Sequence, residues 1–160
     1  MSQLSNIKLE QYIRLYHGTV YRLALGYVKN TAEAEDICQE AFVRLLDYDG
    51  VFDAPENCKA WLIRVTVNLS KNYFKSSRFR QNTELCDDVR ERIPDEYTEL
   101  YDAVTALPIK YRSIVHLYYY EGYSVKEIAD ILKISVTAAT TRLSRARERL
   151  REDLLGEELS

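Results

Sequence analysis

Residues 124–151, SVKEIADILKISVTAATTRLSRARERLR, decide the fold of the C-terminal part of the chain. Ser124 and Glu127 have the spacing of a capping box, in which the serine hydroxyl accepts a hydrogen bond from a first-turn amide and the carboxylate bonds back to the cap. This pair predicts the start of a short helix. Ser135 is a second candidate cap, so a longer helix is predicted to follow a tight turn at Lys133 and Ile134.

Both predicted helices have an apolar face at helical spacing. The apolar positions are Val125, Ile128, Ala129 and Leu132 in the first helix and Val136, Ala139, Leu143, Ala146 and Leu150 in the second. The other sides of the second helix carry hydroxyl and guanidinium groups, on Thr137, Thr140, Thr141, Arg142, Ser144, Arg145, Arg147, Arg149 and Arg151. This combination indicates a helix-turn-helix, whose second helix lies in the DNA major groove. An ordinary helical hairpin with a solvated basic side is the alternative.

The composition of the 160 residues bounds the possible classes of protein. With 46% hydrophobic and 29% charged residues, the chain can form one domain or two small ones with real cores. No apolar run reaches membrane-spanning length and the N-terminus lacks the layout of a signal peptide, which predicts an intracellular protein with no membrane insertion of its own. The sequence has no Cys-x-x-Cys pair, nucleophile motif or phosphate-binding loop. We therefore expect no disulfide framework, metal site, cofactor or catalytic centre, and we assign Cys38 to the core.

The net charge of −3 is unusual for a stand-alone DNA-binding protein, which normally depends on attraction to phosphate. The charges are unevenly distributed. Basic residues cluster at 71–80 and at 142–151, and between them Glu84–Asp102 holds eight acidic residues against two arginines. Helical periodicity fails over 81–95, so we expect a flexible acidic linker there, between the two small helical domains of an all-α fold.

Two helices are predicted before residue 50. The first is long and amphipathic, with apolar residues from Leu9 to Tyr27. Asn30 and Glu33 again have capping-box spacing and predict the start of the second. The outer side of the second helix carries acids and an amide, on Glu33, Asp36, Gln39, Glu40 and Asp47. That side is either a solvated face or a docking surface for a basic partner.

A third helix is predicted to start at Asp53-Ala-Pro55-Glu56, which supplies a cap, a first-turn proline and a carboxylate. Its expected buried residues are Trp61, Leu62, Val65, Leu69 and Tyr73, and its expected exposed residues are Arg64, Asn68, Lys71, Asn72 and Lys75. Lys and Arg can follow a phosphate backbone, and Asn amides can read base edges. The stripe indicates either contact with nucleic acid or a solvated face.

The C-terminal part begins with a helix from Tyr97, followed by one in which Pro108 lies just inside the start and Gly122 just beyond the end. The apolar positions of the first are Leu100, Ala103, Val104 and Leu107. We expect Tyr118–Tyr120 to pack between the second and the helix-turn-helix. This unit then contains four helices.

Three stretches in this order resemble the bacterial RNA polymerase sigma factors of the extracytoplasmic-function (ECF) subfamily. AEAEDICQEAFVRL (residues 32–45) resembles the polymerase-docking helix of that subfamily. WLIRVTVNLSKNYF (61–74) resembles its helix that contacts the minus-ten promoter element, and residues 107–150 resemble its minus-thirty-five reader.

The resemblance implies a region 2 domain over 1–80, a linker over 81–95 and a region 4 domain over 96–160. It implies a sigma factor that binds core RNA polymerase, directs it to specific promoters and promotes DNA opening. It also resolves the charge puzzle, because a subunit that meets DNA within the polymerase holoenzyme need not bind it strongly alone.

Site residues follow from the same resemblance. The residues implied to dock on the clamp coiled coil of core polymerase are Asp36, Gln39 and Glu40. The flap of core polymerase is a second implied contact. Those implied to hold the minus-ten strand are Arg64, Lys71 and Lys75, with Asn68, Asn72 and the loop 47–54 capturing a flipped base. Those implied to face the minus-thirty-five groove are Thr140, Thr141, Ser144 and Arg145, with Arg142 and Arg147 on the DNA backbone or supporting the helix.

The chain departs from the family pattern at three positions. Lys133 stands where the family commonly has glycine, and a left-handed conformation there costs roughly 1 kcal/mol. Thr137 and Thr140 stand where Gly and a basic residue are frequent, which leaves the minus-thirty-five sequence open.

Partners and location are also expectations from the resemblance. Most members of the subfamily are held inactive by an anti-sigma factor, which is the expected partner besides polymerase and promoter DNA. The expected location is the cytoplasm, at the nucleoid through RNA polymerase. A stand-alone helix-turn-helix regulator, which would bind palindromic duplex without polymerase, is the alternative. A pure interaction protein whose basic faces meet acidic partners is the third possibility.

Overall fold

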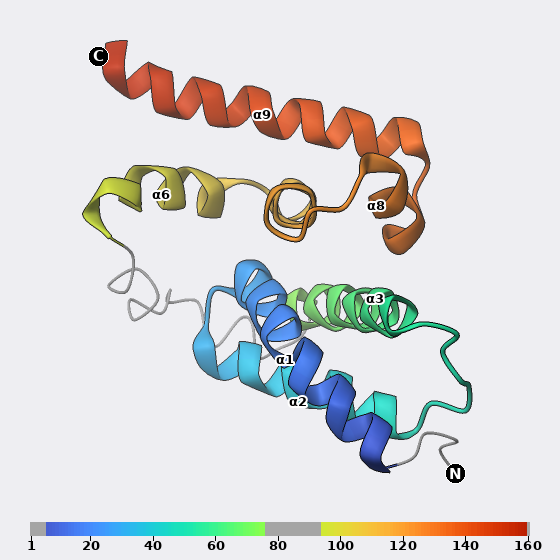
Figure 1. Ribbon diagram of the computed structural model, residues 1–160. Coiled ribbons are helices and arrows are strands. Elements are labelled where there is room, and N and C mark those ends of the chain that lie inside the picture. Colours follow the sequence, from blue (N-terminus) through green and yellow to red (C-terminus); the bar gives the residue numbers. More distant parts are fainter. Residues whose placement is uncertain (1–5, 76–93, 160) are drawn as a thin grey trace. The chain divides into compact units, whose positions relative to one another are not determined.

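A computed structural model describes residues 6–75 and 94–159 (Figure 1). Every regular element within these ranges is a helix, which confirms the predicted all-α fold. The chain divides into two compact units, Met1–Glu84 and Leu85–Ser160. The predicted linker over 81–95 lies outside the described residues except for Pro94 and Asp95.

Three helices build the first unit: α1 (Asn6–Val28), α2 (Thr31–Leu46) and α3 (Pro55–Phe74). Each helix packs against both of the others. Their shared core contains side chains with almost no exposure, among them Val20, Leu23, Ala24, Cys38, Leu45, Leu62 and Ile63. Complete burial of one Leu or Ile side chain contributes ~1.5–3 kcal/mol, so this shared core stabilises all three helices together.

The start of α2 follows the prediction. Asn30 is the N-cap, and its side-chain oxygen accepts a hydrogen bond from the backbone N–H of Glu33 at 3.1 Å. Lys29 has a φ of 54°, and this left-handed residue lets α1 end and α2 begin within two residues. The prediction of Glu33 as a solvated residue is wrong, because only 4% of it is exposed. Its place in the first turn favours a carboxylate even when buried, since the helix N-terminus carries partial positive charge.

The start and the buried face of α3 differ from the prediction. Ala54, not Asp53, is the N-cap, and it supplies no side-chain hydrogen bond. The buried residues are Cys58, Leu62, Ile63, Thr66, Val67, Ser70 and Tyr73, whereas Trp61, Val65 and Leu69 are half-buried. Thr66 Oγ1 donates a hydrogen bond to the Leu62 carbonyl at 2.7 Å, which satisfies its hydroxyl inside the core. An apolar pattern does not identify such positions.

The second unit contains the predicted four helices and two short segments. The elements are η1 (Asp95–Tyr97), α6 (Thr98–Ala106), α7 (Ile109–Val115), the π-helical segment η2 (His116–Tyr120), α8 (Val125–Leu132) and α9 (Val136–Leu159). The long helix α9 packs against α6, α7 and α8 (Figure 1). The core between them contains Leu107, Ile114, Leu117, Ile128, Ala139, Leu143 and Ala146.

The segment η2 continues α7 with one wider turn. Glu121 N donates a hydrogen bond to the His116 carbonyl at 3.0 Å, five residues back along the chain. Tyr119 and Tyr120 are 57% and 59% exposed. The prediction that the tyrosine run packs between helices is therefore wrong for these two. The wider turn shifts them away from the positions that an uninterrupted α-helical period gives.

Three smaller predictions at helix ends also differ. Pro108 directly precedes α7 instead of lying inside it, while Gly122 follows η2 with a φ of 76°, as its predicted role requires. Leu100 and Val136 were expected on apolar faces and are exposed. They lie in the first turns of α6 and α9, where no neighbouring helix covers them.

Both predicted caps of the helix-turn-helix are present. Glu127 N donates to Ser124 Oγ at 3.1 Å and Ser124 N donates to Glu127 Oε1 at 3.0 Å, which completes the capping box of α8. These hydrogen bonds lower the pKa of the Glu127 carboxyl. Ser135 Oγ accepts a hydrogen bond from Ala138 N at 3.0 Å and caps α9.

The turn between α8 and α9 depends on Lys133, which is left-handed with φ 58° and ψ 45°. Ile134 N donates to the Ala129 carbonyl at 3.0 Å, so the turn satisfies a carbonyl at the end of α8. The turn therefore has good hydrogen bonding but an unfavourable residue in its left-handed position.

Replacing this lysine with glycine (Lys133→Gly) removes the unfavourable contact of its Cβ, and we expect the second unit to gain about 1 kcal/mol of unfolding free energy. Urea unfolding followed by circular dichroism measures the change. Glu148→Gly, which places the same residue in the exposed middle of α9, is the control and should lose about 1 kcal/mol. Equal destabilisation by both variants would contradict the role assigned to Lys133.

Candidate nucleic-acid interface

The exposed side of α2 borders a hollow of about 500 Å³. Asp36, Gln39 and Glu40, the predicted docking residues, line it from α2 and are exposed. Glu40 is paired with Arg44 at 3.3 Å on the same helix. An exposed pair of this spacing contributes only ~0.3–0.5 kcal/mol, so the carboxylate can exchange it for a cation on a partner.

The predicted minus-ten stripe follows α3. Asn68, Lys71, Asn72 and Lys75 are exposed, whereas Arg64 is half-buried and has an interaction partner. Positions 64, 68, 71 and 75 are three or four residues apart and therefore form one line along the helix. Asn72 lies beside this line and lines the hollow next to α2, together with Asp36 and Glu40. The structure thus brings one predicted promoter residue to the predicted polymerase-docking face.

The loop 47–54 is anchored by an aromatic cluster. Tyr48 stacks on Phe52, with ring centroids 4.6 Å apart and an interplanar angle of 4°. Both rings also contact Trp61 of α3, with ring centroids 5.1 Å apart for Tyr48 and 6.1 Å apart for Phe52. Phe52 meets Tyr12 of α1 edge to face at 6.0 Å. The loop is therefore held against the N-terminal half of α3 by ring contacts, a feature that sequence reasoning missed because it assigned Trp61 to the core.

This anchoring determines which parts of the implied flipped-base pocket come together. Asn68 is two helical turns beyond Trp61, or roughly 10 Å along the axis, and Asn72 is a further turn away. The residues that line the α2–α3 hollow include Asn72 but no member of the loop 47–54. The α2–α3 hollow is therefore not shared with the loop 47–54.

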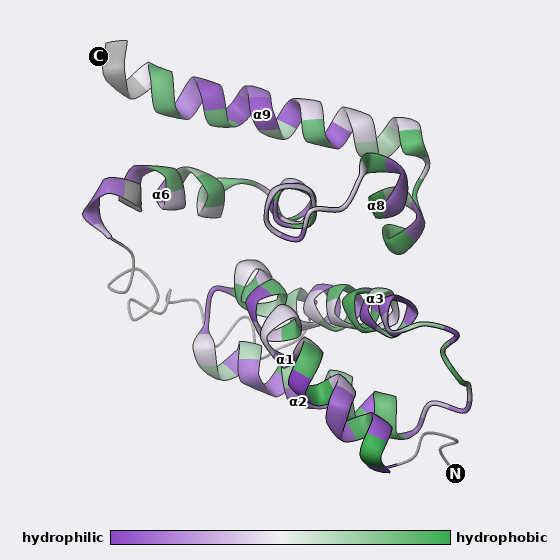
Figure 2. Ribbon diagram, in the orientation of Figure 1, coloured by the Kyte–Doolittle hydropathy of each residue, from purple (hydrophilic) through white to green (hydrophobic). Residues whose placement is uncertain are grey.

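The predicted groove-facing residues lie along the N-terminal half of α9, whose middle turns are mostly hydrophilic (Figure 2). Ser144 and Arg145 are exposed, and Thr141 and Arg142 are half-buried. Thr140 is exposed, but its Oγ1 donates a hydrogen bond to the Val136 carbonyl at 2.9 Å. The exposed part of this face offers hydroxyl and guanidinium groups of the kinds that contact bases and phosphates.

Arg147 is held by two tyrosines that the sequence had placed in the core. Its Nε donates a hydrogen bond to the Tyr119 hydroxyl at 2.6 Å. Its guanidinium carbon lies 5.3 Å from the ring centre of Tyr118 and 5.6 Å from that of Tyr119. The hydrogen bond to Tyr119 raises the pKa of Arg147 further above neutrality.

Tyr111 of α7 engages two more arginines of α9. Its ring is buried and lies 5.1 Å from the guanidinium carbon of Arg149. Burial acts to raise the pKa of Tyr111, but Arg145 beside its hydroxyl and the charges of Lys110 and Arg149 lower it overall. Sequence period alone could not reveal these contacts, because they join separate helices.

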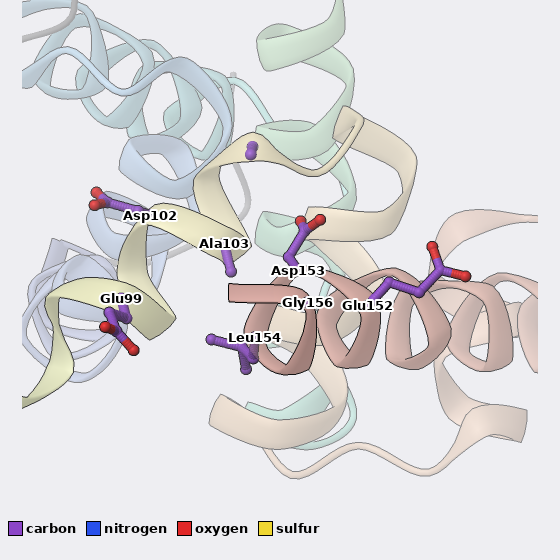
Figure 3. A pocket seen from close by; sticks show the side chains of 8 residues that line it. Glu99, Asp102, Ala103, Glu152, Asp153, Leu154 and Gly156 are labelled. Atoms are coloured by element: carbon purple, nitrogen blue, oxygen red, sulfur yellow. The ribbon is translucent and has the colours of Figure 1, made fainter. Parts of the chain in front are cut away.

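An acidic hollow of about 380 Å³ lies between α6 and the C-terminal part of α9 (Figure 3). Four carboxylates line it: Glu99 and Asp102 from α6, and Glu152 and Asp153 from α9. Such a cluster repels phosphate. The C-terminal part of α9 is therefore unfavourable for an anion, in contrast to the basic turns that precede it.

The buried cysteines are chemically quiet. Burial raises the pKa of Cys38 to about 11, with a smaller contribution from Glu35, and it raises the pKa of Cys58 to about 12. Both thiols are therefore protonated at neutral pH, and the thiolate is the nucleophilic form. Within residues 6–75 and 94–159, no three His, Cys, Asp or Glu side chains gather as metal ligands. Among the helices of these same ranges, none has both the length and the apolar character to cross a bilayer.

Comparison with known proteins assigns both units. Residues 12–80 match the family described as sigma-70 region 2, and residues 97–150 match sigma-70 region 4. The RNA polymerase sigma factor SigV of Bacillus subtilis is 33% identical over 144 residues, which cover 88% of this chain and 87% of that protein. The ECF sigma factor SigL of Mycobacterium tuberculosis is 30% identical over 142 residues, which cover 82% and 80%. The chain is an ECF RNA polymerase sigma factor.

As a member of this family, the sigma factor directs RNA polymerase to promoters for transcription initiation. Its match extends over both units, so the alternatives of a stand-alone regulator and a pure interaction protein are set aside. Two solved structures share its fold with a TM-score of 0.68 and 22% identity each. They are RpoE of Bartonella quintana with the anti-sigma factor NepR, covering 92% of this chain and 96% of that one, and CnrH with the cytosolic domain of CnrY, covering 95% and 90%.

Trp61 is the single tryptophan of the sigma factor, so its fluorescence reports on the aromatic cluster of the loop 47–54. Tyr48→Ala removes a ring from this half-buried site, and we expect the emission to move to longer wavelength as water reaches the indole. The lost ring contacts correspond to ~1 kcal/mol. Val51→Ala changes an exposed residue of the same loop and should leave the emission unchanged. An unchanged spectrum for Tyr48→Ala would contradict the anchoring described above.

Proposed function

We propose that the first unit of this sigma factor docks on polymerase through α2 and holds the minus-ten strand through α3. Asp36, Gln39 and Glu40 then meet the clamp coiled coil of core polymerase. The acidic and amide character of this face supports the proposal, because it complements a cationic surface. The observation that carries it is the hollow that this face shares with Asn72 of α3, since the docking helix and the promoter helix then act side by side.

The α3 stripe follows the separated minus-ten strand. Arg64, Lys71 and Lys75 neutralise its phosphates, and Asn68 and Asn72 contact its bases. The loop 47–54, held against Trp61, forms one wall of a flipped-base site, and Asn68 and Asn72 form another after the loop rearranges on binding.

The second unit reads the minus-thirty-five element through α9. Thr140, Thr141, Ser144 and Arg145 face the major groove, and Arg142 and Arg147 contact the DNA backbone or support the helix. The domains follow the boundaries 1–80 and 96–160, joined by a linker over 81–95, and the flap of polymerase is a second contact. The two buried, protonated thiols are in keeping with a protein that acts through binding energy and without catalysis of its own.

Regulation by an anti-sigma factor belongs to the same proposal. Both solved relatives, RpoE and CnrH, were determined with partners that are an anti-sigma factor or a cytosolic domain, and they share the fold of this chain. We place the protein in the cytoplasm, where its relatives act with RNA polymerase.

The test of the promoter function is transcription from a random promoter library. Bacterial core polymerase and the purified protein are combined, and transcripts that appear only when both are present are sequenced. Two shared and constantly spaced elements upstream of these starts are expected. No added initiation, together with tight duplex binding by the protein alone, would overturn the proposal.

Reversing one charge on α2 (Asp36→Arg) should weaken the affinity for core polymerase at least about tenfold, because a cation then faces a cationic surface. Titration of labelled protein with core enzyme measures the dissociation constant. Glu35→Arg makes the same charge change at an exposed neighbour that does not line the hollow, and it should alter the constant by less than about twofold. Equal weakening by both variants would contradict the assigned docking face.

A further inference from the structure

The arginines of the promoter-reading helix α9 are held on two sides by tyrosines of the helix beneath it. In Figure 1, the coil between α6 and α8, which is α7 with η2, is seen end-on, whereas α9 runs across the view. The two helices also pack against each other. Since one is seen end-on and the other from the side, they cross steeply. The two ends of the α7–η2 coil consequently reach opposite flanks of α9.

The spacing of the arginines on α9 matches this crossing. Successive residues of an α-helix are about 100° apart, so Arg147 lies about 200° around the helix from Arg145, while Arg149 lies within about 40° of Arg145. Arg145 and Arg149 therefore share one flank and Arg147 occupies the other. Tyr111, at the start of α7, contacts Arg149 of the first pair, and Tyr119, in η2, contacts Arg147.

The type of contact leaves the guanidinium groups able to bind DNA. A guanidinium has five N–H donors in its plane, and a tyrosine hydroxyl accepts at most two hydrogen bonds. Stacking over a ring uses the face of the group and not its edge. Most donors of Arg145, Arg147 and Arg149 thus remain directed along the guanidinium edges, where phosphate and guanine acceptors are recognised.

This arrangement orders the arginine side chains before DNA binds. An arginine side chain loses rotamer freedom when it is fixed on DNA, and this entropy loss weakens binding. Tyr111 is a rigid anchor, because only 4% of it is exposed. Tyr119 is mostly exposed; it contacts Arg147 through the 2.6 Å hydrogen bond and through its ring, and its ring also meets that of Tyr118 at 4.9 Å.

We propose that Tyr111 and Tyr119 are positioning residues for promoter recognition: they hold Arg149 on one flank of α9 and Arg147 on the other before DNA arrives. The ligand of the positioned groups is the phosphate backbone and base edges of the minus-thirty-five duplex. This inference rests on the proposed function of α9 and adds two residues outside the predicted site.

The test is a pair of double-mutant cycles in holoenzyme, on a promoter selected from the library described above. Tyr119→Phe should weaken promoter binding about two- to fivefold, and it should have no effect when Arg147→Ala is already present. Tyr111→Leu, which removes the ring that Arg149 covers, should behave likewise with Arg149→Ala. The dependence of affinity on salt should fall by about one unit of slope for Arg147→Ala and stay unchanged for Tyr119→Phe, because positioning removes no charge.

Tyr120→Phe is the matched control, since this exposed neighbour stacks on His116 at 5.0 Å. It should leave promoter affinity unchanged, and thermal unfolding should be the same for all Phe variants. Equal losses from Tyr119→Phe with and without Arg147 would overturn the positioning role, as would no loss in either background. In both of those cases wild-type initiation still stands, whereas failure of the wild-type holoenzyme to initiate at all would overturn the proposed function and this inference together.

Discussion

The close approach of α9 to the helices beneath it is the constraint on which the second unit depends. Ala139 and Ala146 are completely buried in that contact, and Leu143 fills the space between them. Small side chains allow helix axes to come near each other. Because α9 lies so close to α7, its flanking arginines are within reach of tyrosines on the crossing helix. A larger residue at either alanine would lift α9 and separate these groups.

The first unit achieves a different arrangement with the same kind of packing. Helices α2 and α3 bury apolar faces against α1 and against each other, which leaves an acidic face and a basic line on neighbouring helices. The loop 47–54 joins these helices and is held by rings instead of charges. Polar recognition and structural anchoring are thus separated within one small unit.

Local signals were the predictable part of this structure. The caps at Asn30, Ser124 and Ser135 each involve residues three positions apart, so their spacing sufficed. The left-handed conformation of Lys133 is indicated by the family resemblance, which commonly has glycine there, and not by spacing. Contacts between helices were not predictable. Buried Thr66 satisfies its hydroxyl within its own helix and so looks like a surface residue in an apolar pattern. Tyr119 and Trp61 look like core residues in the sequence, but Tyr119 contacts Arg147 and Trp61 contacts the loop 47–54. Most of the site residues implied by the family resemblance are exposed, yet the resemblance could not place Asn72 beside Asp36.

Because η2 is π-helical, the number of residues in this stretch sets where its side chains point, independently of which residues they are. It closes with a hydrogen bond from Glu121 to His116, which spans five residues instead of the four of an α-helix. Deleting one residue between these two would restore an ordinary turn and rotate one part of the segment by about 100° relative to the other. Such a deletion could keep every tyrosine and still direct none of them at Arg147. Homologues that differ here by a single-residue gap are therefore separated by a change of geometry, even where their aligned residues are the same.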